Sequence, residues 1–146
     1  MNPTTNPVNP TTNLLSVVET SLYGDDLETM ETFYTHVLGL PVLAKDPDRH
    51  VFLQVGTANM LLLFKPDSTL APGAFPPHGA HGPGHVALGI PANELETWRA
   101  RLAWHNVEIE HEISWPRGGH SLYFRDPANN SVELITPGVW GIPAGW

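Results

Sequence analysis

The segments DDLE at residues 25–28 and MLLLF at residues 60–64 are matched later in the chain by NELE at 93–96 and VELIT at 132–136. In each half the first segment opens a helical pattern and the second is an apolar strand pattern. An internal repeat of about 55 residues indicates two copies of one supersecondary unit. This repeat decides the fold prediction.

The first half of the chain predicts the order β-α-β-β-β. A β-branched and aromatic run over residues 14–24 is typical of a strand, and Asp25 or Asp26 can cap the next element. A helix is expected over residues 27–38, because apolar residues recur there at three- and four-residue spacing. Turn signals then separate three short strand candidates at residues 42–45, 50–55 and 59–65.

The second half repeats this order. Residues 84–90 form a strand pattern, Asn93 is a candidate helix cap, and Leu95, Trp98 and Leu102 mark one face of a second helix. Three further strands are predicted at residues 107–113, 119–125 and 131–136. Two such modules side by side give an α+β fold, with a curved, mostly antiparallel eight-stranded sheet, both helices outside and an open concave cleft.

Composition sets the domain boundaries. The Asn-, Pro- and Thr-rich start has too few apolar residues to fold and is predicted to be a disordered tail, whereas the Pro-, Gly- and His-rich middle is predicted to be a loop. The predicted parts are a tail at 1–13, modules at 14–66 and 84–137, a connecting loop at 67–83 and a C-terminal tail at 138–146.

Charge and residue usage exclude several functions. With 7 Lys and Arg against 15 Asp and Glu, the net charge of −8 disfavours nucleic-acid and anionic-membrane surfaces. The chain has no cysteine, which excludes disulfides and thiolate ligands, so a metal would need imidazole and carboxylate ligands. Neither a signal peptide nor a membrane-spanning run is recognisable. We expect a soluble cytoplasmic protein that acts on a small molecule.

Three motifs carry a resemblance to a known family. They are VVETSLYG around Glu19, GPGHVAL around His85 and SLYFRDPANNSVELITP around Glu133. In these motifs and in its paired modules, the chain over residues 14–137 resembles the vicinal oxygen chelate superfamily of glyoxalases, fosfomycin-resistance enzymes and extradiol dioxygenases. The resemblance implies that Glu19, His85 and Glu133 are the ligands of a divalent metal ion and that Glu133 is catalytic.

The residues themselves agree with these positions. Glu133 interrupts an apolar strand between Val132 and Leu134, and burying a lone carboxylate is costly unless a cation or another partner satisfies it. Two carboxylates and one imidazole suit Zn²⁺, Mn²⁺, Ni²⁺, Co²⁺ or Fe²⁺. Three protein ligands would leave positions open for water and substrate.

The family resemblance also defines the surroundings of the metal. Glyoxalase I-type members have a fourth ligand on the last strand of the first module, where this chain has Leu61, so a three-ligand site is implied. By resemblance, Ser21 and Tyr123 contact the substrate, and Arg117 is a further candidate for binding an anion. Family members commonly form dimers in which two chains complete each site, so we expect a homodimer.

Several interpretations remain open. The leading one is a metal-dependent enzyme that uses Lewis-acid catalysis on an oxygen-chelating substrate as an isomerase, lyase, thiol transferase or dioxygenase. One alternative is a bleomycin-resistance-type protein that binds a drug without catalysing a reaction. Another is a protein that keeps the fold of the family but binds no metal. His78 and His81 are less favoured as ligands because Gly and Pro around them fix no geometry. Among the tryptophans, those in or near loops could wall a pocket, namely Trp115, Trp140 and Trp146.

Overall fold

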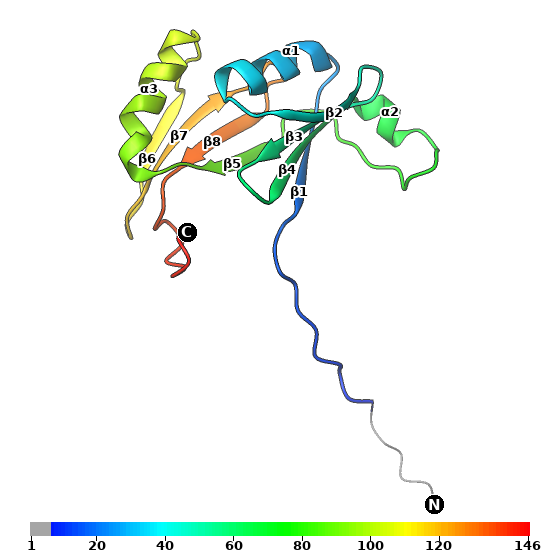
Figure 1. Cartoon of the computed structure of the whole chain (residues 1–146), viewed down its shortest axis with the longest axis horizontal. Coiled ribbons are helices and arrows are strands. Elements are labelled where there is room, and N and C mark those ends of the chain that lie inside the picture. The colour runs from blue at the N-terminus through cyan, green and yellow to red at the C-terminus, as the bar shows by residue number, and fades with distance from the viewer. Residues whose placement is uncertain (1–6) are drawn as a thin grey trace, which may run out of the picture.

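A computed structural model describes residues 7–146 and contains the two predicted modules (Figure 1). The first module consists of β1 (Glu19–Tyr23), α1 (Leu27–Thr32), the π-helix η1 (Phe33–Val37), β2 (Val42–Asp46), β3 (His50–Val55) and β4 (Asn59–Phe64). A short helix, α2 (Pro66–Leu70), comes after it. The second module consists of β5 (His85–Gly89), the 3-10 turn η2 (Ala92–Glu94), α3 (Leu95–Trp104), β6 (His111–Ser114), β7 (His120–Arg125) and β8 (Ser131–Ile135).

The strands form two four-stranded sheets with the same topology. Their orders are β1-β4-β3-β2 and β5-β8-β7-β6, and in each sheet only the first pair is parallel. This confirms the α+β fold of two modules. The eight strands form two separate hydrogen-bonded sheets, and contacts between β1 and β5 join the two sheets.

The core lies between the sheets and the helices that cover one of their faces. Figure 1 shows α1 and α3 on one side of the strands and the C-terminal segment on the other. The predicted apolar stripe of the first helix is buried throughout. Within it, Tyr34 is fully buried and donates a hydrogen bond to Asp126 at 2.8 Å, which ties the two modules together. Burial, and then the Asp126 charge, raise the pKa of Tyr34 well above its usual value.

The first strand and the first helix differ from the prediction. The strand begins at Glu19, and residues 14–18 have no regular structure and are exposed. Its neighbour β4 begins only at Asn59, so β4 is too short to pair with residues 14–18. The helix ends in π geometry, in which the amide of Leu38 bonds to the carbonyl of Phe33 five residues earlier. Asp26 caps it by accepting from the Thr29 amide at 3.1 Å.

Three other expectations need correction. The middle segment contains α2, because Pro66 stands at the first turn, where a proline is tolerated. Asn93 does not cap α3; it lies inside the preceding 3-10 turn. The strand expected from residue 107 begins at His111. Part of the tail predicted at residues 1–13 lies outside the described residues, and its remainder, 7–13, is exposed and irregular.

Within the described residues, no helix combines the length and the apolar character needed to cross a membrane.

Candidate metal centre

The strand β8 carries a buried carboxylate on the sheet face that points away from α1 and α3, called here the open face. Val132 and Leu134 belong to the helix-covered core, so Glu133 between them faces the opposite way. Glu133 is 6% exposed. Its partners in the ladder are Ala87 on β5 and Tyr123 on β7, so both neighbouring strands contribute to its surroundings.

His85 points a ring nitrogen at this carboxylate. Its Nδ1 lies 3.0 Å from the carbonyl oxygen of Ser131, which can only accept, so Nδ1 carries the proton and donates. Nε2 lies 3.3 Å from Oε1 of Glu133. In a neutral ring Nε2 is an acceptor, so Nε2 of His85 and Oε1 of Glu133 are two acceptors that face one another. Such a pair is stabilised by a shared cation, either a proton or a metal ion.

The spacing of these two atoms fits a metal. Nitrogen and oxygen ligands about 2.1 Å from one ion lie about 3 to 3.4 Å apart when the angle at the ion is between right-angled and tetrahedral. A carbonyl that accepts from the other ring nitrogen is one of the common ways in which proteins orient a metal-binding histidine. The pair formed by His85 and Glu133 can therefore supply two ligands.

A hydrogen-bond chain fixes the other oxygen of Glu133. Ser121 is fully buried and donates to Oε2 of Glu133 at 2.5 Å. The indole Nε1 of Trp115 in turn donates to the Ser121 hydroxyl at 2.8 Å. Because an indole N–H can only donate, the hydroxyl proton must point to the carboxylate. No pattern in the sequence pointed to this set of hydrogen bonds, although Trp115 and Ser121 lie in the turn and the strand predicted around residue 119.

Of the predicted substrate-binding residues, only Tyr123 adjoins the pair. Its ring stacks on His85 with centroids 6.4 Å apart and planes inclined by 22°. Burial, and then the charge of Glu133, raise its pKa, so the phenol keeps its proton at neutral pH. Ser21 lies on the other sheet, paired with Leu62. Arg117 is exposed and donates to the carbonyl of Trp140 at 3.1 Å.

The third predicted ligand stands apart from the pair. Within residues 7–146, no three His, Asp or Glu side chains gather closely enough to hold an ion. Glu19 is exposed at the start of β1. The strands β1 and β5 meet with opposite ends together: Leu22 approaches Gly84, whereas Thr20 shares a cavity lining with Gly89. Glu19 therefore lies by the end of β5 that is remote from His85.

The residue that stands where glyoxalase I-type members have their fourth ligand is Leu62, and not Leu61 as predicted. Thr20 pairs with Leu61 and Ser21 pairs with Leu62, while Ala87 pairs with Glu133. If the strand starts β1 and β5 are equivalent, Ser21 matches Ala87, and Leu62 matches Glu133. Leu61 points into the helix-covered core instead. Neither leucine can bind a metal, so the prediction that this position supplies no ligand is unchanged.

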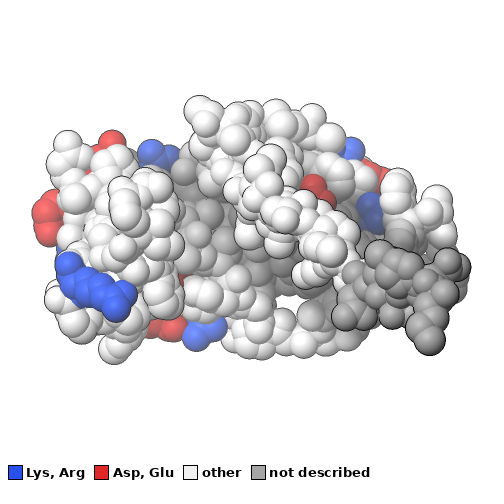
Figure 2. Space-filling model, turned by 90° about the horizontal axis from the view of Figure 1, so that it is seen from below, with Lys and Arg blue, Asp and Glu red and all other residues white. Residues whose placement is uncertain are grey.

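The open face carries few charges and an apolar cavity. Figure 2 shows the molecule from below, with mostly uncharged surface and scattered charged side chains. A cavity of about 520 Å³ lies where the start of β1 meets the end of β5, and Trp140 and Trp146 line it. The Trp146 ring lies against Gly89, where any Cβ would overlap it. Trp115 is not among its lining residues.

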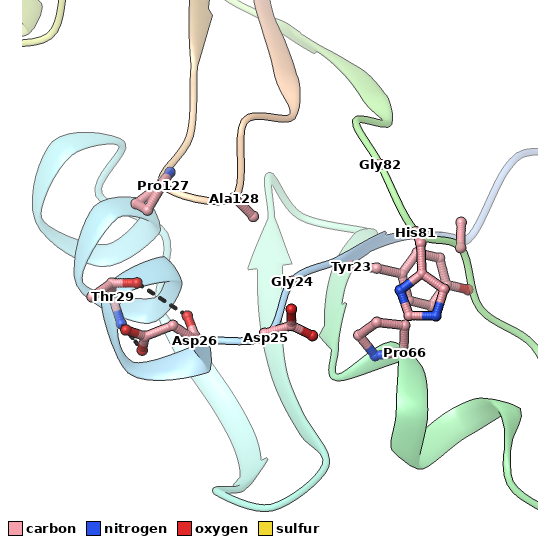
Figure 3. Close-up of a pocket in the computed structure, with 11 residues that line it drawn as sticks. Tyr23, Gly24, Asp25, Asp26, Thr29, Pro66, His81, Gly82, Pro127 and Ala128 are labelled. Atoms are coloured by element: carbon pink, nitrogen blue, oxygen red, sulfur yellow. Dashed lines mark hydrogen bonds between the residues drawn. The ribbon is translucent and has the colours of Figure 1, made fainter.

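A second, smaller cavity lies at the other end of β1. It has a volume of about 270 Å³ and is bordered by the start of α1, the segment after α2 and the β7–β8 turn (Figure 3). Asp26 turns back to cap α1, while Asp25 is an exposed residue on the border of the cavity. His81 is on the border too, 3.5 Å from Asp67. His78 donates to or accepts from the Tyr23 hydroxyl at 2.7 Å.

Comparison with known proteins identifies the family. A family model described as the Glyoxalase/Bleomycin resistance protein/Dioxygenase superfamily matches residues 16–134. The chain belongs to this superfamily. A crystal structure of lactoylglutathione lyase from Agrobacterium tumefaciens shares 40% identity with it, covers 84% of this chain and 94% of its own, and superposes with a TM-score of 0.80.

More distant members of the superfamily share the fold. One, described as a glyoxalase, bleomycin resistance protein or dioxygenase from Nocardioides, has 22% identity, covers 86% of this chain and 85% of its own, and gives a TM-score of 0.68. A glyoxalase or dioxygenase from Nostoc punctiforme also has 22% identity, covers 90% and 97%, and gives 0.65. No curated protein matches the chain. The predicted family and fold are confirmed, while the roles of individual residues stay predictions.

Proposed function

We propose that the protein is a divalent-metal-dependent enzyme of the glyoxalase and dioxygenase type, acting on a small substrate that chelates through oxygen. The observation that carries this proposal is the facing pair of acceptors, His85 Nε2 and Glu133 Oε1, 3.3 Å apart. Each is oriented by a partner behind it, the Ser131 carbonyl and the Ser121 hydroxyl. When bound, the metal would supply Lewis acidity that stabilises negative charge on substrate oxygen.

The surrounding residues would act on the substrate. Tyr123 lies against His85 with its phenol protonated, so it can donate a hydrogen bond to a substrate oxygen. Burial of Glu133 and Ser121 keeps water from competing for the carboxylate. The Agrobacterium relative named lactoylglutathione lyase supports chemistry of the glyoxalase type.

A second copy of the chain would complete the site. The pair provides two ligands, and Glu19 stands exposed on the other module. We propose that Glu19 of one protomer joins His85 and Glu133 of its partner in a twofold dimer, which would form two identical sites. Light scattering should then report a dimer, and a monomer that carries a full metal content would contradict the shared site.

Metal analysis tests the proposal. The protein as purified, and after incubation with Zn²⁺, Mn²⁺, Ni²⁺, Co²⁺ or Fe²⁺ followed by desalting, is measured by elemental mass spectrometry. We expect about one ion per chain in the wild type and a large loss in Glu133→Gln. Glu112→Gln is the matched control, because that carboxylate pairs with Arg99 and His120 elsewhere. A wild type that binds none of these metals, or Glu133→Gln binding as well as wild type, would refute it.

A second candidate is drug binding of the bleomycin-resistance type. It is favoured by the mostly apolar cavity of about 520 Å³ with two tryptophans and by the net charge of −8, which suits a cationic ligand. Titration with bleomycin, monitored by tryptophan fluorescence, separates the two candidates. Saturable quenching in metal-free protein would favour drug binding, and its absence would favour the enzyme.

A further inference from the structure

We propose that the open face of the first module binds an anionic group of the substrate through Arg49, which His50 holds in place beside a floor of aromatic rings. The inference rests on the proposed function, because it assigns a substrate class to that enzyme: an acid with a flat apolar body. The residues involved belong to the sheet of the first module, whereas the metal pair belongs to the sheet of the second, and none of them is a predicted ligand.

Aromatic side chains of β3 and β4 lie side by side on the open face of the first module. His50 stacks on Phe52 with ring centroids 4.0 Å apart and planes inclined by only 9°. Phe64 meets Phe52 edge to face at 5.7 Å. The register pairs His50 with Phe64 and Phe52 with Leu62, so these side chains share one face of β3 and β4. His50 and Phe52 are only half-buried and can be reached by a ligand.

Arg49 places a positive charge at the edge of these rings. Its guanidinium lies 5.3 Å from the ring centroid of Phe64 and 3.1 Å from Nδ1 of His50. Within the described part of the chain no carboxylate comes within salt-bridge distance of it, whereas Lys45 and Arg125 each have a glutamate partner. In a chain of charge −8, an unpaired guanidinium is a ready partner for an anion.

The contact with Arg49 also sets the proton on His50. A guanidinium only donates, so Nδ1 of His50 accepts and Nε2 of the neutral ring carries the hydrogen. Burial, and then the charge of Arg49, lower the pKa of His50, which keeps the ring neutral at pH 7. Within residues 7–146 that N–H has no hydrogen-bond acceptor. The Nδ1 and Nε2 atoms face different sides of the ring, so a carboxylate or phosphate would be bound by the guanidinium N–H groups that His50 leaves free, while His50 holds the guanidinium in place.

The sheet register sets the length of the ligand. Glu19 and Tyr23 stand at opposite ends of β1, four residues or about 13 Å apart. His50 is level with Tyr23, because both pair with Phe64. Arg49 lies over Phe64 of β4 and beside His50 of β3, so it is also one to two strands, or about 5 to 10 Å, from β1 across the sheet. A substrate that reaches from a metal near Glu19 to Arg49 would therefore place its chelating oxygens and its anionic group about 14 to 16 Å apart, with apolar atoms over Phe52 and Leu62 between them.

The competing explanation is that Arg49 only holds the segment after α2. Its guanidinium also lies 5.7 Å from the ring of Phe75, which belongs to that segment. A purely structural Arg49 would affect stability without affecting the binding of acids. The test must therefore measure ligand binding and folding separately.

Nuclear magnetic resonance titration of metal-free protein in EDTA makes this distinction. Benzoate is the probe and benzamide its neutral counterpart. We expect benzoate to give saturable amide shifts in residues 50–54 and 60–64, with benzamide about tenfold weaker. Arg49→Gln should weaken benzoate binding about tenfold while keeping a dispersed spectrum. Lys65→Gln is the matched control, since it removes an equal charge beside the same sheet, and should bind within about twofold of wild type.

The outcomes are decisive. Absent or non-saturable shifts in those strands, or equal binding by Arg49→Gln and wild type, would overturn the proposal. Equal binding of benzamide would show an apolar site without anion recognition and would overturn it as well. Because the titration contains no metal, a failed metal analysis with intact benzoate binding would refute the enzyme alone, whereas full metal content without benzoate binding would refute the anion site alone.

Discussion

Replacing Ser121 by alanine should be costly, because its hydroxyl joins two buried groups. It accepts from the Trp115 indole and donates to the Glu133 carboxylate, and it is fully buried. A hydrogen bond to a charged group contributes about 1.5 to 3 kcal/mol, and an indole donor left without a partner costs about 1 kcal/mol more. We expect Ser121→Ala to lose about 3 kcal/mol of unfolding free energy, or roughly 6 to 12 °C in melting temperature.

Urea denaturation of metal-free protein measures this loss without any contribution from a bound ion. Ser114→Ala is the matched control, because Ser114 is exposed on the adjacent strand, and it should stay within about 0.5 kcal/mol of wild type. Trp115→Phe should cost about 1 kcal/mol, and its effect should not add to that of Ser121→Ala. If Ser121→Ala were as stable as Ser114→Ala, the hydroxyl would not hold the carboxylate. In metal-loaded protein, Ser121→Ala should also weaken metal binding by about 10- to 100-fold.

Two other predictions concern the C-terminus and the first module. Gly89→Ala should expel the Trp146 ring, because the new Cβ would overlap it, and the indole N–H resonance of Trp146 should move toward its random-coil position; Gly73→Ala, which meets nothing within 4 Å, should leave that resonance unchanged. His50 should titrate below its usual pKa of 6.5, since burial and Arg49 lower it. Because the folded state favours the neutral ring, the contribution of His50 to stability is complete above pH 6.5 and is lost as the pH falls through the folded-state pKa. A titration midpoint of His50 at or above pH 6.5 would contradict this prediction.

The repeat made the fold predictable from the sequence, whereas strand limits depended on neighbours. Helical and alternating patterns are local signals, so the order of elements could be read directly. Residues 14–18 have strand composition, yet β4 is too short to pair with all of them. Aligning the similar sequences MLLLF and VELIT made Leu61 the equivalent of Glu133, whereas the strand register makes Leu62 the equivalent. A one-residue shift moves a side chain to the other face, and residue similarity alone does not define register.

The candidate site was predictable only in part. His85 and Glu133 meet because side chains alternate between the two faces of a strand, which puts both residues on the same face of the paired strands β5 and β8. The hydrogen bond from Trp115 to Ser121 crosses a turn between side chains, and no periodic pattern encodes such a contact. The distance of Glu19 from the pair depends on how the two modules pack, which is a tertiary property.

In the proposed dimer, one protomer supplies Glu19 and its partner supplies His85 and Glu133. Glu19→Gln and Glu133→Gln chains, co-expressed with different affinity tags, can be purified as heterodimers by two successive columns. A shared site predicts one intact site and one doubly altered site in each heterodimer, so its metal content should be about half that of wild type while both mutant homodimers carry little. A heterodimer as empty as the two homodimers would contradict the shared site.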